Sequence, residues 1–242
     1  CEMITKRLSL TNQSKVIEIA SNDGYLLKNF VDANIPCLGI EPTLATANAA
    51  KKLGIPVISE FFTEKFAQQL LNESVSADLI IGNNVIAHVP DINDFIKGLK
   101  LVLSAMGTIT LEFPHLMELV DKNQFDTIYH EHFSYLSFSV VNHLLKQQEL
   151  TIYDVEALDT HGGSLRIYVC HQAAEKEVNP AVISMLNKEL HCGLQTLNYY
   201  HAFQKKVEQV KSQVIDFLTK QKKRGKIVVG YGAAAKGNTL LN

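Results

Sequence analysis

The chain has 242 residues, of which 46% are hydrophobic and 20% are charged, and its formal net charge is −2. This composition predicts one large globular domain plus an additional piece, and gives no reason to expect a nucleic-acid partner. No apolar run approaches the roughly 20 residues that cross a bilayer, and the N-terminus lacks the layout of a signal peptide. We therefore expect a cytoplasmic protein with no membrane partner.

The first half of the chain alternates short β-branched runs with segments of helical spacing. The expected strands are residues 15–19, 37–40, 57–58, 78–82 and 108–112, and the expected helices between them are residues 25–31, 44–53, 64–71 and 92–103. Strands that alternate with helices predict an α/β fold with a parallel, doubly wound sheet. In such sheets ligands bind at the carboxyl ends of the strands, so the functional residues should follow the strands.

The second half predicts three further parts. An amphipathic helix at residues 137–148 precedes two runs, 151–157 and 164–169, that read as an antiparallel strand pair closing the sheet. Residues 180–223 have a helical pattern, and Gly225 precedes a run, 226–229, that reads as the first strand of a second α/β unit.

The turn after the first strand, Glu18 to Gly24, predicts a site for the charged tail of a cofactor, since backbone N–H groups there attract carboxylate or phosphate. It holds one glycine and is a poor dinucleotide fingerprint. Glu41 follows the second strand, 23 positions after Glu18, where a carboxylate can accept hydrogen bonds from both ribose hydroxyls. Both NAD and S-adenosylmethionine satisfy this spacing.

Two polar segments predict the chemistry. The loop after the fourth strand, residues 83–91, contains His88 and should face the reaction centre. Residues 129–132 (Tyr-His-Glu-His) form the densest cluster of proton-transfer groups in the chain, and such groups can abstract a proton next to a carbonyl. The alternatives are a polar surface loop or a zinc site, but no third ligand stands at a recognisable spacing, so we expect no metal.

Three other positions carry weaker signals. His115 follows the fifth strand, and His161 precedes two glycines that a simple hairpin turn would explain. Residues 230–237 follow the last expected strand, and their amides with Lys236 could hold a phosphate.

Six blocks of sequence, in order, resemble the C-methyltransferases that act on keto-deoxysugar nucleotides. The blocks are VIEIASNDGYLL (16–27), GIEPT (39–43), NNVIAHVPD (83–91), YHEHFSYL (129–136), HGGSLRIY (161–168) and GYGAAAKGNTLLN (230–242). The resemblance implies a class I methyltransferase fold with S-adenosylmethionine as cofactor. It also implies a three-part enzyme, of which this chain would be a fragment lacking an N-terminal zinc domain and most of a C-terminal domain.

On this resemblance, residues 1–172 would form the methyltransferase domain, and residues 173–242 a helical connector and the beginning of a nucleotide-sugar domain. Family members methylate C3 of a dTDP-4-keto-6-deoxyhexose, so the expected partner is a small nucleotide sugar. His132 would be the base, with Tyr129, Glu131 and His88 lining the sugar site. The expected cofactor residues are Glu18, Ala20, Ser21, Asn22, Gly24, Glu41, Pro42, Asn83 and Asn84, and the expected substrate residues are His115, His161, Gly232 and Lys236.

Two other functions remain open from the sequence. The chain could bind the cofactor without catalysing a reaction, because part of the implied enzyme is missing. It could also be a nicotinamide-dependent sugar oxidoreductase, although the weak phosphate fingerprint and the absence of a Y-x-x-x-K pair count against that reading.

Overall fold

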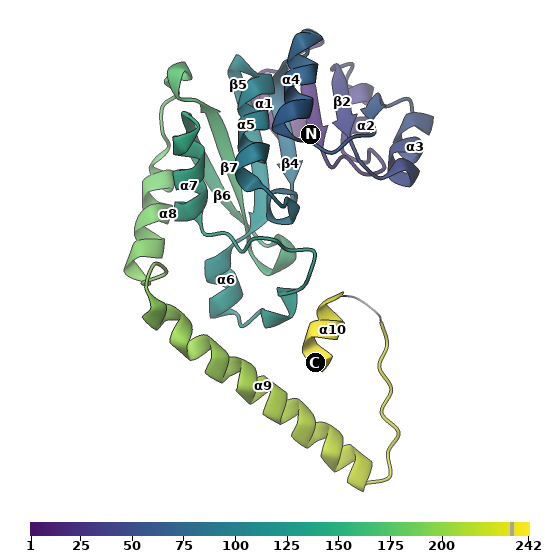
Figure 1. Cartoon of the computed structure of the whole chain (residues 1–242), viewed down its shortest axis with the longest axis vertical. Coiled ribbons are helices and arrows are strands. Elements are labelled where there is room, and N and C mark those ends of the chain that lie inside the picture. The colour runs from purple at the N-terminus through teal and green to yellow at the C-terminus, as the bar shows by residue number, and fades with distance from the viewer. Residues whose placement is uncertain (233–234) are drawn as a thin grey trace.

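The computed structural model describes residues 1–232 and 235–242. Its centre is a seven-stranded sheet with the strand order β3-β2-β1-β4-β5-β7-β6 (Figure 1). The strands are β1 (Val16–Ile19), β2 (Cys37–Ile40), β3 (Val57–Ile58), β4 (Ala77–Asn83), β5 (Leu103–Pro114), β6 (Leu150–Leu158) and β7 (Ser164–His171). The first five strands are parallel, and β7 runs antiparallel to both β5 and β6. The predicted doubly wound sheet with an antiparallel closing pair is confirmed.

Helices cover both faces of the sheet and leave two apolar cores. The helices are α1 (Glu2–Leu8), α2 (Leu27–Asp32), α3 (Leu44–Lys52), α4 (Glu64–Asn72), α5 (Ile92–Val102), α6 (Leu116–Asp121), α7 (Phe138–Gln147), α8 (Pro180–His191), α9 (Leu197–Lys223) and α10 (Ala235–Leu241). One core lies beneath α1, α2 and α3, and the larger one lies beneath α4, α5 and α7. Alternate residues of β1 point into the two cores, as Val16 and Ile17 do.

Side-chain caps mark where several helices begin. The Asp91 carboxylate accepts hydrogen bonds from two N–H groups in the first turn of α5, and the Ser137 hydroxyl accepts one in the first turn of α7. Asn179 caps α8, in which Pro180 occupies the first helical position. These caps explain why the expected helix starts at residues 92 and 137 lie within one residue of the observed ones.

The C-terminal segment differs from the expectation at residues 226–229. Residues 180–223 are helical, and they form two helices because α8 ends near Cys192 and a turn with Gly193 at φ 78° precedes α9. Residues 226–229 are not a strand: within the described part of the chain no sheet edge lies beside them to share backbone hydrogen bonds. Ala233 and Ala234, in the predicted phosphate-binding turn, lie outside the described residues.

The long helix α9 extends away from the sheet, and the chain then returns so that α10 lies near α6 (Figure 1). Thr239 on α10 donates a hydrogen bond of 2.9 Å to the carbonyl oxygen of Ile128. Among the described residues, no helix is both long enough and apolar enough to span a membrane.

Candidate active site

The candidate site lies at the sheet edge where the parallel strands end. The expected cofactor residues follow or end three strands: residues 18–24 at β1, residues 41–42 at β2, and residues 83–84 at β4. Since β1 pairs with both β2 and β4, these strand ends are neighbours. The structure therefore brings the three groups together at the edge where α/β sheets bind ligands.

The turn after β1 has an unusual backbone. Ala20, Asn22 and Gly24 have φ values of 56°, 50° and 80°, in the left-handed region. At Gly24 a side chain is also excluded by space, because a Cβ atom would lie 2.3 Å from the Cδ1 atom of Ile55. Turns of this kind form concavities lined by backbone N–H groups, which bind anionic groups such as a carboxylate.

Three buried polar atoms at this edge have no hydrogen-bond partner among the described residues: Glu18 Oε2, Ser21 Oγ and Asn84 Oδ1. Buried polar groups in proteins are nearly always paired, so unpaired ones at a strand edge indicate room for a polar ligand or water. Burial also raises the pKa of Glu18 to about 8. A ligand that donates hydrogen bonds or carries positive charge would stabilise the charged form of the Glu18 carboxyl most.

Glu41 is buried, and backbone N–H groups hold its carboxylate in place. Its Oε1 atom accepts a hydrogen bond of 2.8 Å from Thr43, and its Oε2 atom accepts one of 3.0 Å from Asn22. A carboxylate oxygen has two lone pairs, so both atoms can accept a further hydrogen bond from a hydroxyl pair.

A cavity of about 550 Å³ adjoins these residues. Its wall includes Ala20, Pro42 and His88, three of the expected site residues, and apolar side chains such as Phe61 and Val85. Its size and its mainly apolar wall with a few polar groups are typical of small-molecule sites. With Glu41 next to Pro42, the cavity suits a nucleoside.

The sequence analysis missed one part of this cavity. Glu60, Phe61 and Phe62 line it directly after β3, and Phe61 is 74% exposed. Their position after a strand was the available signal, since the same rule singled out the residues after β1, β2 and β4.

The second part of the site is the histidine loop, residues 129–135. The Nδ1 atom of His132 lies 2.9 Å from the carbonyl oxygen of Thr127, and a carbonyl can only accept, so Nδ1 carries a proton. Nε2 then holds the lone pair, 3.4 Å from the hydroxyl of Tyr129. Burial lowers the pKa of His132, with the Thr127 hydrogen bond opposing and the charge of His88 reinforcing the effect. The imidazole is therefore neutral at pH 7 and can accept a proton.

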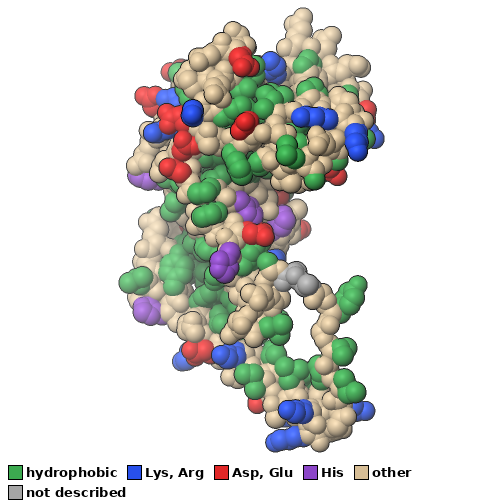
Figure 2. All heavy atoms as spheres, turned by 45° about the vertical axis from the view of Figure 1, so that its right-hand side comes forward, with side chains coloured by type: hydrophobic (Ala, Val, Ile, Leu, Met, Phe, Trp, Pro, Cys, Tyr) green, Lys and Arg blue, Asp and Glu red, His purple; other side chains and the backbone are tan. Residues whose placement is uncertain are grey.

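Several aromatic rings surround His132. The ring of His88 lies 4.7 Å away, that of Tyr129 4.5 Å and that of Tyr135 5.8 Å, measured between centroids. Burial raises the pKa of Tyr129, with the charge of Glu131 as a second cause, so its hydroxyl stays protonated. Figure 2 shows histidine side chains gathered midway along this face of the molecule. The structure thus brings the expected catalytic residues His88, Tyr129, Glu131 and His132 together.

Backbone hydrogen bonds join the histidine loop to the cofactor side. The N–H groups of Phe133 and Ser134 donate to the carbonyl oxygen of Ala87, at 2.9 and 3.3 Å. Phe133 also lines the large cavity together with His88. His132, on this loop, therefore lies close to the cavity.

The expected substrate residues do not all lie together. The charge of Lys236, on α10, contributes to the lowered pKa of His132, so this side chain is near that imidazole. His161 and Gly232 are exposed, and His161 lies in the turn between β6 and β7. His115 is not open to a ligand: its side chain is 1% exposed and pairs with Glu189.

Glu112, at the end of β5, is a further polar group that the sequence analysis did not select. Its carboxylate accepts hydrogen bonds from Thr160 at 2.8 Å and from Arg166 at 2.9 Å, and its backbone carbonyl accepts one from Asn84. The group joins β5, β7 and the loop after β4. In the described ranges, no three His, Cys, Asp or Glu side chains are placed to hold a metal ion.

Comparisons with known proteins agree with this geometry. Residues 1–155 match the family model described as a methyltransferase domain, and residues 159–242 match the model of a C-methyltransferase C-terminal domain. Among solved structures, an S-adenosylmethionine-dependent methyltransferase from Clostridium acetobutylicum superposes with a TM-score of 0.55 at 11% identity, covering 70% of this chain and 88% of that one. Magnesium protoporphyrin IX methyltransferase from Synechocystis, solved with bound SAH, superposes with a TM-score of 0.53 at 12% identity. The match covers 70% of this chain and 78% of that one.

The fold is thus that of class I methyltransferases, as the sequence resemblance implied. The chain belongs to the methyltransferase domain family. The C-methyltransferase NovU from Streptomyces niveus is 35% identical over 240 residues, which are 99% of this chain and 57% of NovU. The chain therefore spans little more than half the length of that curated relative.

Proposed function

We propose that this chain carries the methyl-transferring site of an S-adenosylmethionine-dependent C-methyltransferase, whose acceptor is the carbon beside the ketone of a nucleotide-linked keto-deoxysugar. Similarity to a C-methyltransferase over nearly the whole chain supports the reaction class. The choice of sugar nucleotide rests on the family resemblance of the six sequence blocks. The observation that carries the proposal is the unprotonated Nε2 atom of His132, on a loop whose next residue, Phe133, lines the cavity.

The residues at the strand ends fit S-adenosylmethionine. Glu41 would accept hydrogen bonds from the ribose hydroxyls, and the cavity beside Pro42 and Phe61 would hold the adenine. The turn at residues 20–24 would hold the methionine carboxylate, and the unpaired oxygens of Glu18 and Asn84 would accept from its ammonium group. When bound, this cofactor supplies the electrophilic methyl group that the acceptor carbon receives.

The histidine loop would generate the nucleophile. The ketone acidifies the neighbouring C–H, and Nε2 of His132 removes that proton, leaving an enolate. The Tyr129 hydroxyl or His88 would donate a hydrogen bond to the enolate oxygen, and the negative charge of Glu131 stabilises the imidazolium. Holding both reactants at one site can supply about 7–11 kcal/mol of the rate advantage.

The division of the chain follows from the same proposal. Residues 1–172 would form the methyltransferase domain, since the last strand, β7, ends at His171. Residues 173–242 would form the connector and the beginning of the nucleotide-sugar domain, and the charge of Lys236 in this part acts on His132. The positive charge of Lys236 would suit the nucleotide phosphates.

The test compares His132→Ala with a matched histidine. His143→Ala removes an exposed imidazole on α7 and should leave turnover unchanged. His132→Ala should abolish methyl transfer to a dTDP-keto-deoxysugar while the affinity for S-adenosylmethionine, measured by calorimetric titration, stays close to that of the wild type. Unchanged turnover in His132→Ala would remove the base assignment.

The binding titration also separates the other functions. Binding of S-adenosylmethionine without turnover would support a catalytically silent cofactor-binding chain. Binding of NADH in place of S-adenosylmethionine would support an oxidoreductase and overturn the proposal.

A further inference from the structure

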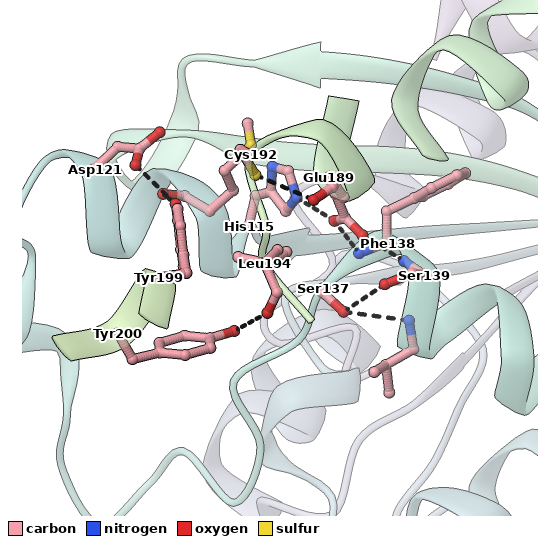
Figure 3. A network of polar contacts seen from close by, with 12 residues as sticks. His115, Asp121, Ser137, Phe138, Ser139, Glu189, Cys192, Leu194, Tyr199 and Tyr200 are labelled. Atoms are coloured by element: carbon pink, nitrogen blue, oxygen red, sulfur yellow. Dashed lines mark hydrogen bonds and ion pairs between the residues drawn. The ribbon is translucent and has the colours of Figure 1, made fainter. Parts of the chain in front are cut away.

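Glu189, on α8, is buried at the start of α7, next to Phe138 and Ser139 (Figure 3). Its side chain is 0% exposed, and its carboxylate has three partners. The Oε1 atom lies 2.6 Å from His115 Nε2 and 2.6 Å from the backbone nitrogen of Phe138, and Oε2 lies 2.8 Å from the nitrogen of Ser139. A buried carboxylate with this many donors holds the groups around it in one arrangement.

The carboxylate is ionised. Burial alone would raise the pKa of Glu189, but the hydrogen bonds from His115, Ser139 and Phe138 outweigh burial and lower the pKa. A negative charge at the first turn of α7 also interacts favourably with the positive end of the helix dipole.

The residues that Glu189 holds lie on both sides of the histidine loop's C-terminal end. His115 and Leu136 form a parallel β-bridge, and the N–H of Leu116 donates to the carbonyl oxygen of Leu136 at 2.9 Å. Phe138 follows two residues later. Glu189 therefore binds both His115, which follows β5, and the first residues of α7. These two segments meet where the histidine loop ends.

His132 lines a small cavity together with Pro114, Leu116 and Leu136. Its volume is about 10 Å³, close to the smallest that holds a water molecule. Since so little free space separates these side chains, a shift of Leu116 or Leu136 should displace the imidazole.

A second set of contacts binds helix α6, which follows His115. The hydroxyl of Tyr199, on α9, donates to Asp121 at 2.7 Å and lies 3.3 Å from the carbonyl oxygen of Met117, both on α6 (Figure 3). Helix α6 directly follows His115. Helices α8 and α9 thus both bind the segment from His115 to Asp121, part of which lines the small cavity beside His132.

We propose that Glu189 is a positioning residue, which through His115, Phe138 and Ser139 sets the place of the histidine loop and thereby the direction of the His132 imidazole. The inference rests on the proposed function of His132 as the base. It assigns α8, which lies within the match to the C-methyltransferase C-terminal domain, a part in the chemistry without contact to either reactant.

The first test measures the titration of His132 by NMR in the 242-residue chain, without substrate. The groups that face His132 are His88, Glu131, Tyr129, Tyr135 and Lys236, and none of them changes in Glu189→Gln. This variant places an amide N–H₂ group against a backbone N–H group, so the histidine loop should become more mobile. His132 should then be less buried, and its pKa should rise toward the ordinary value. The exposed Glu177→Gln, also a carboxyl-to-amide change, should leave the titration at its wild-type position.

The second test measures turnover. Glu189→Gln should lower kcat by about 10- to 100-fold, the cost of a misplacement of about 1 Å, with the KM for S-adenosylmethionine unchanged. If Glu189→Gln does not fold, His115→Gln serves instead, because the carboxylate keeps its two backbone donors there. A folded variant with the wild-type His132 titration would overturn the inference. A shifted titration in a chain that transfers no methyl group would support positioning and separately remove the proposed function.

Discussion

The carboxylate of Glu41 and the backbone N–H of Asn22 share a hydrogen bond of 3.0 Å, which ties the turn after β2 to the turn after β1. The two turns belong to different βα units, and this contact sets their spacing. One carboxylate therefore shapes the proposed cofactor turn and offers its remaining lone pairs to the ribose.

Replacing Glu41 with glutamine should weaken cofactor binding. The amide would direct an N–H₂ group at a backbone donor and remove acceptor capacity, so the Kd for S-adenosylmethionine should rise about 10- to 100-fold, or about 1.4–2.7 kcal/mol. Calorimetric titration measures this. Glu73→Gln, at an exposed position after α4, is the matched control and should bind as the wild type does. Equal affinities for the two variants would contradict the role of Glu41.

Ala20→Gly should stabilise the chain. Ala20 has φ 56°, and a non-glycine residue in that region costs roughly 1–2 kcal/mol. Glycine removes this strain but gains freedom in the unfolded chain, so the expected net gain is about 0.5–1 kcal/mol. Ala49→Gly, at an exposed position within α3, should instead destabilise by about 0.5–1 kcal/mol. Urea unfolding of both variants measures whether the free energy of unfolding rises in Ala20→Gly and falls in Ala49→Gly. A loss of stability in Ala20→Gly would contradict the left-handed backbone conformation at this position.

The pH dependence of turnover should follow His132. Its pKa is lowered, chiefly by burial, so the imidazole is already neutral at pH 7 and gains its proton only below the ordinary histidine range. We expect kcat/KM to rise with pH through an inflection below pH 6.5, the ordinary value, and then to stay level, since the raised pKa of Tyr129 keeps that hydroxyl protonated. A pH–rate profile measures this. An inflection above pH 7 would indicate a different base.

Glu18 should make the stability of the cofactor-free chain fall as pH rises. Burial raises its pKa to about 8 from 4.5. Between these values the folded chain keeps the proton and the unfolded chain loses it, so the free energy of unfolding decreases with pH and levels off above about pH 8. The loss between pH 5 and 8 is up to about 4 kcal/mol.

Glu18→Gln removes this titration. Urea unfolding measures this at pH 5 and pH 8.5. The free energy of unfolding of Glu18→Gln, relative to that of the wild type, should be higher at pH 8.5 than at pH 5. The free energy of unfolding of Glu73→Gln should equal that of the wild type at both pH values. A difference between Glu18→Gln and wild type that does not change with pH would show that Glu18 ionises at its ordinary pKa.

Much of the sheet and one side of the site could be predicted because their signals are local. Strands β1, β2 and β4 are short, mainly apolar runs that end in polar turns, and Glu41 stands directly after its strand. The same local logic predicted a strand at residues 226–229, wrongly, because a strand also needs a neighbouring edge, and none lies beside these residues in the described part of the chain.

Glu189 could not be found in this way. It lies 74 residues from His115, in a helical segment rich in Lys, Gln and Glu that is typical of a solvated surface. Its burial is a product of how α8 packs on α7 and β6, which no periodicity within α8 records. His115, in turn, looked like a ligand residue because it follows β5, whereas its partner comes from a helix with no sequence signal.

The wall of the large cavity comes from residues 19–95, with Phe133 as the one exception among its lining residues. Apart from His88, the groups proposed to meet the acceptor come from residues 129–132 and from the C-terminal segment. Genetic recombination between relatives could therefore exchange the later part of the gene, and with it the acceptor, while the methyl-donor half is inherited intact. The two parts would have to match where Phe133 and His132 meet Ala87 and His88.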